Sequence, residues 1–369
     1  MPVATLSRLE RLLAPYRDLS NQEMRAQLKA YLDEHRESRF PSTHTLNRNA
    51  RILMAGKRYR FALAVSGYEG LSGRTAEPPV VQAATWLEWY HLYTLFLDDI
   101  MDEDVRRRRL PSAWHANAQL YRGKDGSDPG IVFRDRRARY GGSQAILDAL
   151  RIRSLAERAI QRASGLGASL RERLLEELTE VDLVLSEGQG LDIDFENAPR
   201  ITEDEYERMS ERKTGRLYVS AATTAAVLAS ADAGEQAALE MFARHFSAAF
   251  QDRDDLLGAG IVRSEIGGSS MGDIRNGKRT RLFAMAIQRI PDPERAAFLG
   301  SYGRGRATTA KDIARVRSLL KGDVLDAMNA RISSSVSSAV AALDRIHFHD
   351  ESAKDLLTFL ARVQLVRVS

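Results

Sequence analysis

The distribution of proline is the feature that most constrains how this 369-residue chain can fold. Only 10 prolines occur, and the stretches 130–198, 200–290 and 294–369 contain none. Proline lacks a backbone N–H and its ring clashes with the preceding turn, so long proline-free stretches rich in alanine, leucine, arginine and glutamate favour helices. The sequence contains no convincing run of alternating apolar and polar residues. It therefore predicts an all-α protein.

Local patterns support this prediction. Apolar residues recur at helical spacing between Leu170 and Leu185, with charged residues between them. Thr202, followed by Asp204 and Glu205, is typical of a helix N-terminus, and we expect that helix to cover residues 203–230.

The chain shows no repeat period and no linker that would divide it. The sequence GKDGSDPG at 123–130 is typical of a turn and predicts an inserted loop over 116–142. Hydrophobic residues make up 44% of the sequence, enough for a sizeable core. We therefore expect residues 1–369 to form a single large helical bundle.

Composition excludes several classes of function. Cysteine is absent, so a disulfide framework, a thiolate metal site and a cysteine nucleophile are excluded. The net charge of +4 gives no argument for a nucleic-acid partner. No segment has the pattern of a signal peptide, and the longest bland stretch, 219–233, is too short and too polar to span a bilayer. We expect a soluble, cytoplasmic protein, and we expect the small residues of 219–233 to let two helices approach closely.

A cluster of aspartates follows the apolar run 92–97. In a helix, Asp98 and Asp102 lie on one face with Asp99 beside them, and their mutual repulsion would not stabilise an apolar helix. Mg²⁺ takes carboxylate oxygens and leaves room for substrate phosphate oxygens, so the cluster is typical of a hard-metal site. The alternative is an acidic helix end in solvent.

A second pair, Asp254 and Asp255, ends another apolar helix that begins near Ala238. Taken alone, this pair also suits a solvent-exposed helix end. Two such helices that face each other would hold Mg²⁺ ions around one diphosphate. The two clusters together therefore indicate a site that ionises a diphosphate.

The chain resembles the trans (E-type) isoprenyl diphosphate synthases, the polyprenyl synthetase family, from about residue 50 to 285. The resemblance rests on motifs in the family's order rather than on one aspartate cluster. These motifs are GKRYR at 56–60, Glu88 with His91, DDIMD at 98–102, Arg107 with Arg108, Gln189 with Asp192, Lys213 with Thr214, Gln251 with Asp254 and Asp255, and Asp273 with Lys278.

The resemblance implies a role for each motif in prenyl transfer. The aspartate motifs, Asp98, Asp99, Asp102, Asp254 and Asp255, would bind Mg²⁺, three ions with the allylic diphosphate in the family pattern. Lys213 and Arg107 would add positive charge on that diphosphate. The oxygen dipoles of Thr214 and Gln251 would favour the allylic cation without quenching it.

The resemblance also implies a second, metal-free diphosphate pocket, for isopentenyl diphosphate, formed by Lys57, Arg60, His91 and Arg108. Arginine suits a phosphate because its planar guanidinium donates two parallel hydrogen bonds. Two alternatives stay open. The arginines at 106–109 also suit a nucleic-acid patch or a solvated face, and His91 also suits a buried core position.

Product length is argued from the helix before the first aspartates. Tyr93 lies five residues before Asp98, roughly 7–8 Å along the helix axis, and Thr94 is small. In the family, an aromatic residue at this position resembles the pattern of enzymes with C20 products, in which it forms the floor of the product tunnel. We predict geranylgeranyl diphosphate as the product; the alternative is that Tyr93 only packs in the core.

The sequence departs from the family at four places. Gly258 stands at the last aspartate of the second motif, and Gly268 replaces an expected lysine. Phe61 replaces a proline, and the helix at 145–150 lacks the usual Gly-Asp pair. These changes leave the metal motifs intact but bear on activity and substrate preference.

The sequence thus predicts a homodimeric isoprenyl diphosphate synthase. Alternatives are a farnesyl or longer-chain synthase, a terpene cyclase on the same scaffold, and a weakly active partner subunit. The cyclase is disfavoured because it has no use for an isopentenyl diphosphate pocket. The partner subunit is disfavoured because Asp98, Asp102 and Asp254 are intact.

Overall fold

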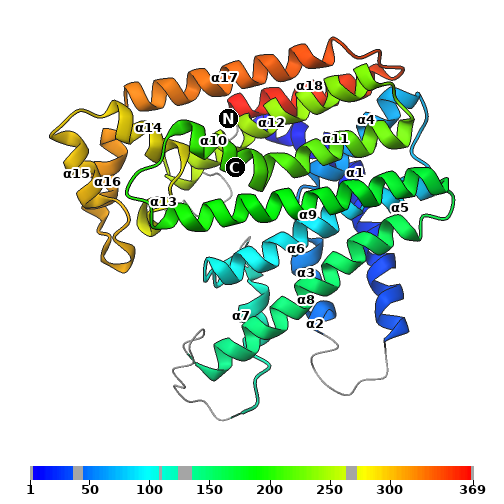
Figure 1. Cartoon of the computed structure of the whole chain (residues 1–369), viewed down its shortest axis with the longest axis horizontal. Helices are drawn as coiled ribbons and strands as arrows, with labels where there is room; N and C mark the ends of the chain where they lie inside the picture. The colour runs from blue at the N-terminus through cyan, green and yellow to red at the C-terminus, as the bar shows by residue number, and fades with distance from the viewer. Residues whose placement is uncertain (1–2, 36–44, 108–109, 124–134, 263–271, 367–369) are drawn as a thin grey trace. The chain divides into compact units, whose positions relative to one another are not determined.

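A computed structural model describes residues 3–35, 45–107, 110–123, 135–262 and 272–366 (Figure 1). These residues are helical apart from short connections and one antiparallel ribbon, in which strand β1 (Arg106–Arg107) pairs with strand β2 (Leu110–Pro111). The prediction of an all-α protein is confirmed.

The chain divides into two compact units, and the single domain that we expected over residues 1–369 stays a prediction. The first unit comprises Met1–Leu12, Ser66–Arg74 and Glu176–Ser369, and the second comprises Leu13–Val65 and Thr75–Leu175. Each unit is assembled from separate stretches of chain, so no linker in the sequence marks the division. Helices α1 (Val3–Glu34), α4 (Tyr59–Ser72) and α9 (Ala168–Glu196) each contain a boundary.

The second unit is built around helix α6. The helices that lie wholly within this unit are α2 (Thr45–Arg48), α3 (Ala50–Met54), α5 (Pro78–Ala84), α6 (Trp86–Met101), α7 (Ala113–Ala118) and α8 (Arg136–Gln161). Helix α6 packs against α8 and α7, and the large side chains Trp86, Trp89 and Phe96 are buried. The end of α6 is thereby fixed on a packed core.

The loop predicted over 116–142 is shorter than expected. Helix α7 continues to Ala118, and α8 begins at Arg136. The carboxylate of Asp135 caps α8 by accepting a hydrogen bond from the Ala138 N–H at 2.6 Å. Residues 124–134 lie outside the described part of the chain.

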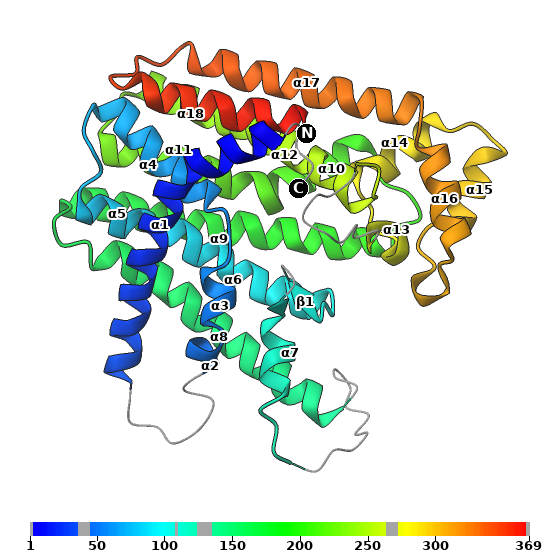
Figure 2. The same cartoon turned by 180° about the vertical axis from the view of Figure 1, so that it is seen from behind.

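The first unit contains most of the C-terminal helices. They are α10 (Glu203–Ser210), the π-helical turn η2 (Glu211–Gly215), α11 (Arg216–Ala229), α12 (Ala233–Gly258), α13 (Gly272–Asn276), α14 (Arg281–Arg289), α15 (Glu294–Ser301), the 3₁₀ turn η3 (Gly305–Ala307), α16 (Ala310–Leu319), α17 (Asp323–Leu343), α18 (Glu351–Arg362) and the 3₁₀ turn η4 (Val363–Leu365). Helix α12 packs against α17 and α11, and Figure 2 shows α17 and α18 side by side.

The helix expected over 203–230 runs through α10, η2 and α11. Thr202 forms a capping box with Glu205, as the sequence indicated. The small residues of α11 allow a close approach, because a Cβ atom at Gly67 of α4 would lie only 2.9 Å from the Ala225 Cβ. No described helix is long and apolar enough to cross a membrane.

Candidate active site

The first aspartate cluster lies at the end of α6, where the ribbon folds an arginine back onto it. The Arg107 guanidinium donates to Asp99 Oδ1 at 2.5 Å and to Asp98 Oδ2 at 3.0 Å. Asp102 is the C-cap residue of α6, so its side chain emerges where the helix ends. The structure therefore brings Asp98, Asp99 and Arg107 into direct contact.

The aspartates of this cluster differ in burial. Asp99 is buried, and burial raises its pKa to about 6 although Arg107 favours the charged form. Its Oδ2 atom is buried without a hydrogen-bond partner among the described residues. Asp98 and Asp102 are partly exposed. Asp98 and Asp102 are accessible to a metal ion, whereas Asp99 is buried against Arg107, which also contacts Asp98.

The GKRYR segment is anchored to α6 by the arginine that sequence analysis did not single out. Arg58 is buried with a left-handed φ of 58° and donates to Glu88 Oε2 at 3.2 Å. The Phe61 N–H donates to Glu88 Oε1 at 3.1 Å, a hydrogen bond that a proline at 61 could not form.

This anchor bears on the predicted isopentenyl diphosphate pocket. Glu88 and His91 are three residues apart on α6 and share a face, so the segment that carries Lys57 and Arg60 is tied to the face that carries His91. The side chains of Lys57, Arg60 and His91 are partly exposed. Arg108, the fourth predicted residue, lies outside the described residues.

The residues predicted to set product length lie on α6. Tyr93 is partly buried and packs edge-on against Tyr90, with ring centroids 5.3 Å apart. The Thr94 hydroxyl donates to the backbone carbonyl of His91 at 2.9 Å.

The turn η2 displays the Lys213–Thr214 pair. Lys213 Nζ lies 2.5 Å from Asp192 Oδ2 on α9, which joins two of the predicted motifs. A Cβ atom at Gly188 would lie 2.3 Å from the Lys213 backbone nitrogen, so glycine is required for α9 to approach η2 this closely. Gln189 follows on α9 and is partly exposed. π-Helical turns occur frequently at functional sites, and this one places both residues of the pair.

Thr214 continues into a chain of hydrogen bonds that reaches the second aspartate cluster. Its hydroxyl donates to Gln251 Oε1 at 3.1 Å, and Gln251 Nε2 donates to Asp255 Oδ1 at 3.0 Å. The Tyr206 hydroxyl and the Arg281 N–H also donate to Asp255, at 3.0 and 2.9 Å. The structure thus brings Thr214, Gln251 and Asp255 together.

The two residues of the second cluster are also unlike. Asp255 is buried, and burial, reinforced by nearby Asp252 and Asp273, raises its pKa to about 8. Asp254 is partly exposed. Asp255 therefore resembles Asp99, because the carboxylates of both accept hydrogen bonds from other groups of the protein. Asp254 is the more accessible carboxylate of the pair.

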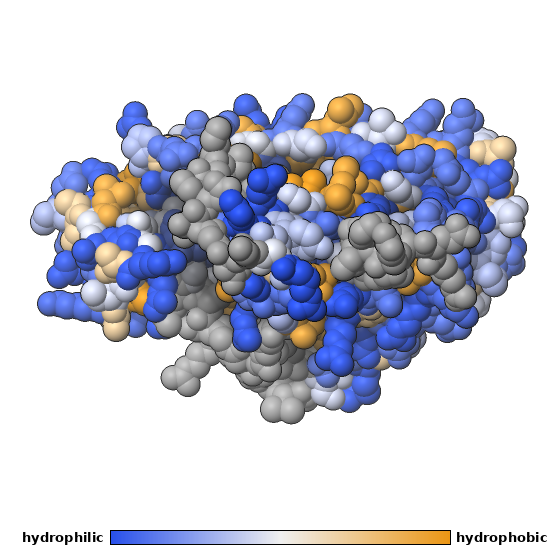
Figure 3. All heavy atoms as spheres, turned by 90° about the horizontal axis from the view of Figure 1, so that it is seen from below, coloured by the Kyte–Doolittle hydropathy of each residue, from blue (hydrophilic) through white to orange (hydrophobic). Residues whose placement is uncertain are grey.

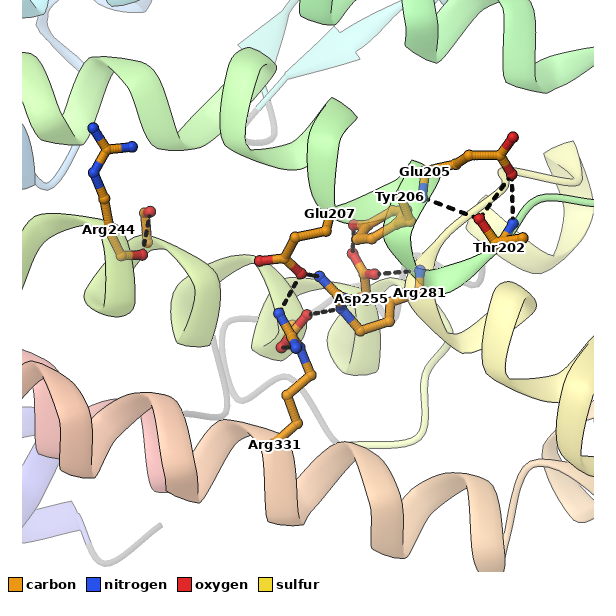
Figure 4. A network of polar contacts seen from close by, with 10 residues as sticks. Thr202, Glu205, Tyr206, Glu207, Arg244, Asp255, Arg281 and Arg331 are labelled. Atoms are coloured by element: carbon orange, nitrogen blue, oxygen red, sulfur yellow. Dashed lines mark hydrogen bonds and ion pairs between the residues drawn. The ribbon is translucent and has the colours of Figure 1, made fainter. Parts of the chain in front are cut away.

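A charge network lies beside Asp255, with Arg281 and Asp252 buried and Glu207 and Arg331 partly exposed (Figure 4). Asp252 accepts from Arg281 Nε at 2.5 Å and from Arg331 Nε at 2.9 Å, and Glu207 accepts from both guanidinium groups. The Arg281 guanidinium also lies 4.8 Å from the centre of the Tyr206 ring. The network joins α10, α12, α14 and α17. Sequence reasoning missed it because its members are far apart in the chain and form no local pattern.

Gly258, the family departure in the second aspartate motif, has a structural counterpart. A Cβ atom at Gly258 would lie 1.9 Å from Asp273 Oδ2, so the Asp273 carboxylate occupies the space that a side chain at 258 would need. The Lys278 N–H donates to the Asp273 carbonyl at 3.0 Å. Gly268 lies outside the described residues.

The helix without the Gly-Asp pair has a buried carboxylate of its own. Asp148 on α8 accepts hydrogen bonds from Thr45 Oγ1 at 2.5 Å and Asn117 Nδ2 at 3.2 Å, and it pairs with Arg151 at 2.9 Å. It therefore joins α2, α7 and α8 in the second unit.

The carboxylates fit Mg²⁺ in chemistry, because they supply hard oxygen donors at helix ends. The described residues hold no group of three or more histidine, cysteine, aspartate or glutamate side chains arranged as a metal site. Mg²⁺ commonly binds through one or two carboxylates with phosphate oxygens completing the shell. The partly exposed Asp98 and Asp102 of the second unit, and separately Asp254 of the first unit, suit ions that arrive with a diphosphate.

Comparison with known proteins matches this chain to one family model, Polyprenyl synthetase, over residues 44–341. A geranylgeranyl diphosphate synthase of Methanosarcina mazei is 28% identical over 312 residues, which cover 85% of this chain and 86% of that protein. A geranylfarnesyl diphosphate synthase of Aeropyrum pernix is also 28% identical, over 86% of this chain and 92% of that protein.

A solved structure gives the same result at the level of the fold. Geranylgeranyl pyrophosphate synthase from Corynebacterium glutamicum, complexed with isoprenyl diphosphate and magnesium, is similar with a TM-score of 0.81 and 26% identity. The match covers 97% of this chain and 99% of that one.

Proposed function

The chain belongs to the polyprenyl synthetase family, and we propose that it condenses an allylic diphosphate with isopentenyl diphosphate. The observation that carries this proposal is the turn η2, where Lys213 pairs with Asp192 and Thr214 bonds to Gln251. Those four residues come from three motifs of the sequence, and they meet within the first unit.

We assign Asp98, Asp102 and Asp254 as the carboxylates for Mg²⁺, with Asp99 and Asp255 as buried supports of the two helix ends. Mg²⁺ would supply Lewis-acid neutralisation of the allylic diphosphate when bound. The number of ions, three by family resemblance, is part of the proposal.

The other side chains act directly on the substrates. Lys213 and Arg107 neutralise diphosphate oxygens, and the fixed oxygen dipoles of Thr214 and Gln251 stabilise positive charge on the allylic carbons. Lys57, Arg60 and His91, with Arg108, bind isopentenyl diphosphate. The released diphosphate takes the proton lost after C–C bond formation, so no protein base is required.

The activity is tested by incubating the protein with Mg²⁺, labelled isopentenyl diphosphate and C5, C10 or C15 allylic diphosphates, and then sizing the products. We expect elongated diphosphates, and a loss on the order of 100-fold or more in kcat/KM for Asp98→Asn and Asp254→Asn. Asp194→Asn, at an exposed aspartate of α9, is the matched control. Hydrocarbon without incorporation of label would instead identify a cyclase, and no product would identify a partner subunit.

We propose geranylgeranyl diphosphate as the product, with Tyr93 as the tunnel floor. Tyr93→Ala is expected to lengthen the main product by at least one C5 unit, because the ring that blocks the growing chain is removed. Chromatography of the dephosphorylated products measures the length. Tyr90→Phe, which keeps a buried aromatic ring on the same helix, should leave the product unchanged. An unchanged product from Tyr93→Ala would contradict the assignment of the floor.

We also propose a homodimer, because apolar side chains are exposed along two helices. Leu150 on α8 is 56% exposed and Leu183 on α9 is 62% exposed, and Leu147 lies one turn before Leu150. A cytoplasmic location stays a prediction from the sequence.

A further inference from the structure

Positive charge is concentrated in one segment of the first unit, residues 302–321, which we call the basic segment. It contains six basic residues and one acidic residue, a net charge of +5, whereas the whole chain carries +4. The rest of the chain is therefore slightly acidic, and the segment accounts for the basic character of the protein.

The fold turns the basic side chains outward. The segment runs from the end of α15 through η3 to α16, and α15 and α16 lie side by side at the left edge of Figure 1. Ile313, Val316 and Leu320 are buried, whereas Lys311 and Arg315 are exposed on the opposite side of α16. This helix is amphipathic, with a cationic outer face.

The one acidic residue of the segment, Asp312, does not neutralise the cationic face of α16. Asp312 is 13% exposed, accepts from the Thr309 N–H and hydroxyl in a capping box, and pairs with Arg304 at 3.1 Å. The other five basic residues form no ion pair with any residue that the structure describes. They are Arg306, Lys311, Arg315, Arg317 and Lys321.

Helix α8 offers a contrast to the basic segment. Its arginines are also dense, but Arg153 pairs with Glu157 at 2.9 Å and Arg158 pairs with Glu34 at 2.7 Å. Charges that are paired within the protein need no partner, whereas those on α16 remain available to an external anion.

The neighbouring helix exposes an apolar side chain. Leu299 on α15 is 45% exposed, and α15 packs directly against α16. The left-hand end of Figure 3, where these helices lie, shows a few hydrophobic groups among hydrophilic ones.

We propose that the basic segment, together with Leu299, binds an anionic lipid surface. Cationic side chains near such a surface each raise the partition coefficient by about fivefold, and an adjacent leucine adds apolar contact below the headgroups. Nucleic acid would attract the same cations. The exposed Leu299, however, adds to binding only if the partner offers an apolar phase, as a lipid membrane does. The inference does not rest on the proposed enzymatic activity.

The test uses the full-length protein with vesicles of phosphatidylcholine, with or without phosphatidylglycerol, and measures partition by co-sedimentation. We expect binding only to vesicles that contain phosphatidylglycerol, with affinity falling steeply as salt is raised. The double variant Lys311→Gln/Arg315→Gln should lower the partition coefficient by about 25-fold. Leu299→Ser should lower it severalfold without changing the salt dependence.

The matched control is Arg25→Gln/Lys29→Gln, which removes two exposed basic residues at the same spacing on α1, neither in an ion pair with a described residue. We expect this control to bind like the unmodified protein. Equal binding to pure phosphatidylcholine, no binding at low salt, or equal losses in the two double variants would overturn the proposal. So would tighter binding of the basic segment to an RNA or DNA oligomer than to the anionic vesicles. Thermal melts check that each variant is folded, and the prenyl-transfer assay is run separately, so failure of one proposal is distinguishable from failure of the other.

Discussion

At the residue scale, the second aspartate of each acidic cluster is buried, while its neighbours stay partly exposed. Asp99 is held by Arg107, and Asp255 by Tyr206, Gln251 and the Arg281 N–H. Burial raises the pKa of both carboxyl groups, which makes them weaker as freely charged ligands and better suited to fixing a helix end.

Protonation of His245 on α12 should make the stability of the folded protein depend on pH. Burial lowers its pKa, and Glu207 opposes that shift only in part. A lowered pKa means that the folded state binds the proton less well than the unfolded chain does, so this contribution to stability is present above about pH 6.5 and is lost as the pH falls below it. We expect His245→Gln to lose less stability than the unmodified protein between about pH 7.5 and pH 5.5. Urea unfolding at both pH values measures this, and an identical loss in both proteins would contradict it.

At the scale of elements, the contact between α9 and η2 depends on one glycine. Gly188→Ala would place a Cβ atom 2.3 Å from the Lys213 nitrogen, so α9 or η2 must shift, which disturbs the Lys213–Asp192 pair. We expect a loss of about 1–3 kcal/mol in the free energy of unfolding, with a fall in kcat.

Gly190 is a matched control on the same helix, because a Cβ atom there meets nothing within 4 Å. Gly190→Ala should be neutral or stabilising by up to about 1 kcal/mol. Chemical denaturation and kinetics of both variants test the comparison, which fails if the two alanines behave alike.

The charge network joins four helices and contains one buried ion pair, Arg281 with Asp252. The effect of this pair on stability depends on both partners being present. Arg281→Met leaves Asp252 buried with only Arg331 beside it, so we expect a loss of about 3–5 kcal/mol. Adding Asp252→Leu removes the stranded carboxylate and should recover part of that loss. A double-mutant cycle on the free energy of unfolding measures the coupling, and additive effects would show that the pair does not act as one unit.

At the scale of the whole molecule, the chain consists of two units, each assembled from separate stretches of sequence and each carrying one aspartate cluster. Helix α8 in the second unit and helix α9 in the first unit both expose leucines, and we propose that a second copy of the chain covers them.

The proposed dimer predicts a lower mass in solution when charged residues replace the exposed leucines of α8. Leu147→Glu/Leu150→Glu should convert the protein to a monomer, because two carboxylates in an apolar interface cannot be paired there. Light scattering coupled to size-exclusion chromatography measures the mass. Met241→Glu, at another exposed apolar residue, should leave it unchanged, and a double variant that stays dimeric would rule out this interface.

Much of the fold and part of the site were predictable from local signals. Proline spacing and the Thr202 cap predicted the helices, and the order of the motifs predicted the family. Which residues carry the chemistry stays a prediction. The predicted loop was too long because the residues after Asp135 give no helix signal that outweighs the turn residues before them. In the structure the Asp135 side chain caps α8, which therefore begins at Arg136.

The sequence by itself determined the helical class and the family, because these depend on local propensity and on motif order. Tertiary structure alone decided which carboxylates are buried, that Arg58 anchors Glu88, and that Asp273 takes the space beside Gly258. It also decided the charge network, whose partners Glu207 and Arg331 lie 124 residues apart. Burial and long-range pairing depend on how helices pack, and packing is set by all the contacting elements together rather than by any one stretch of chain.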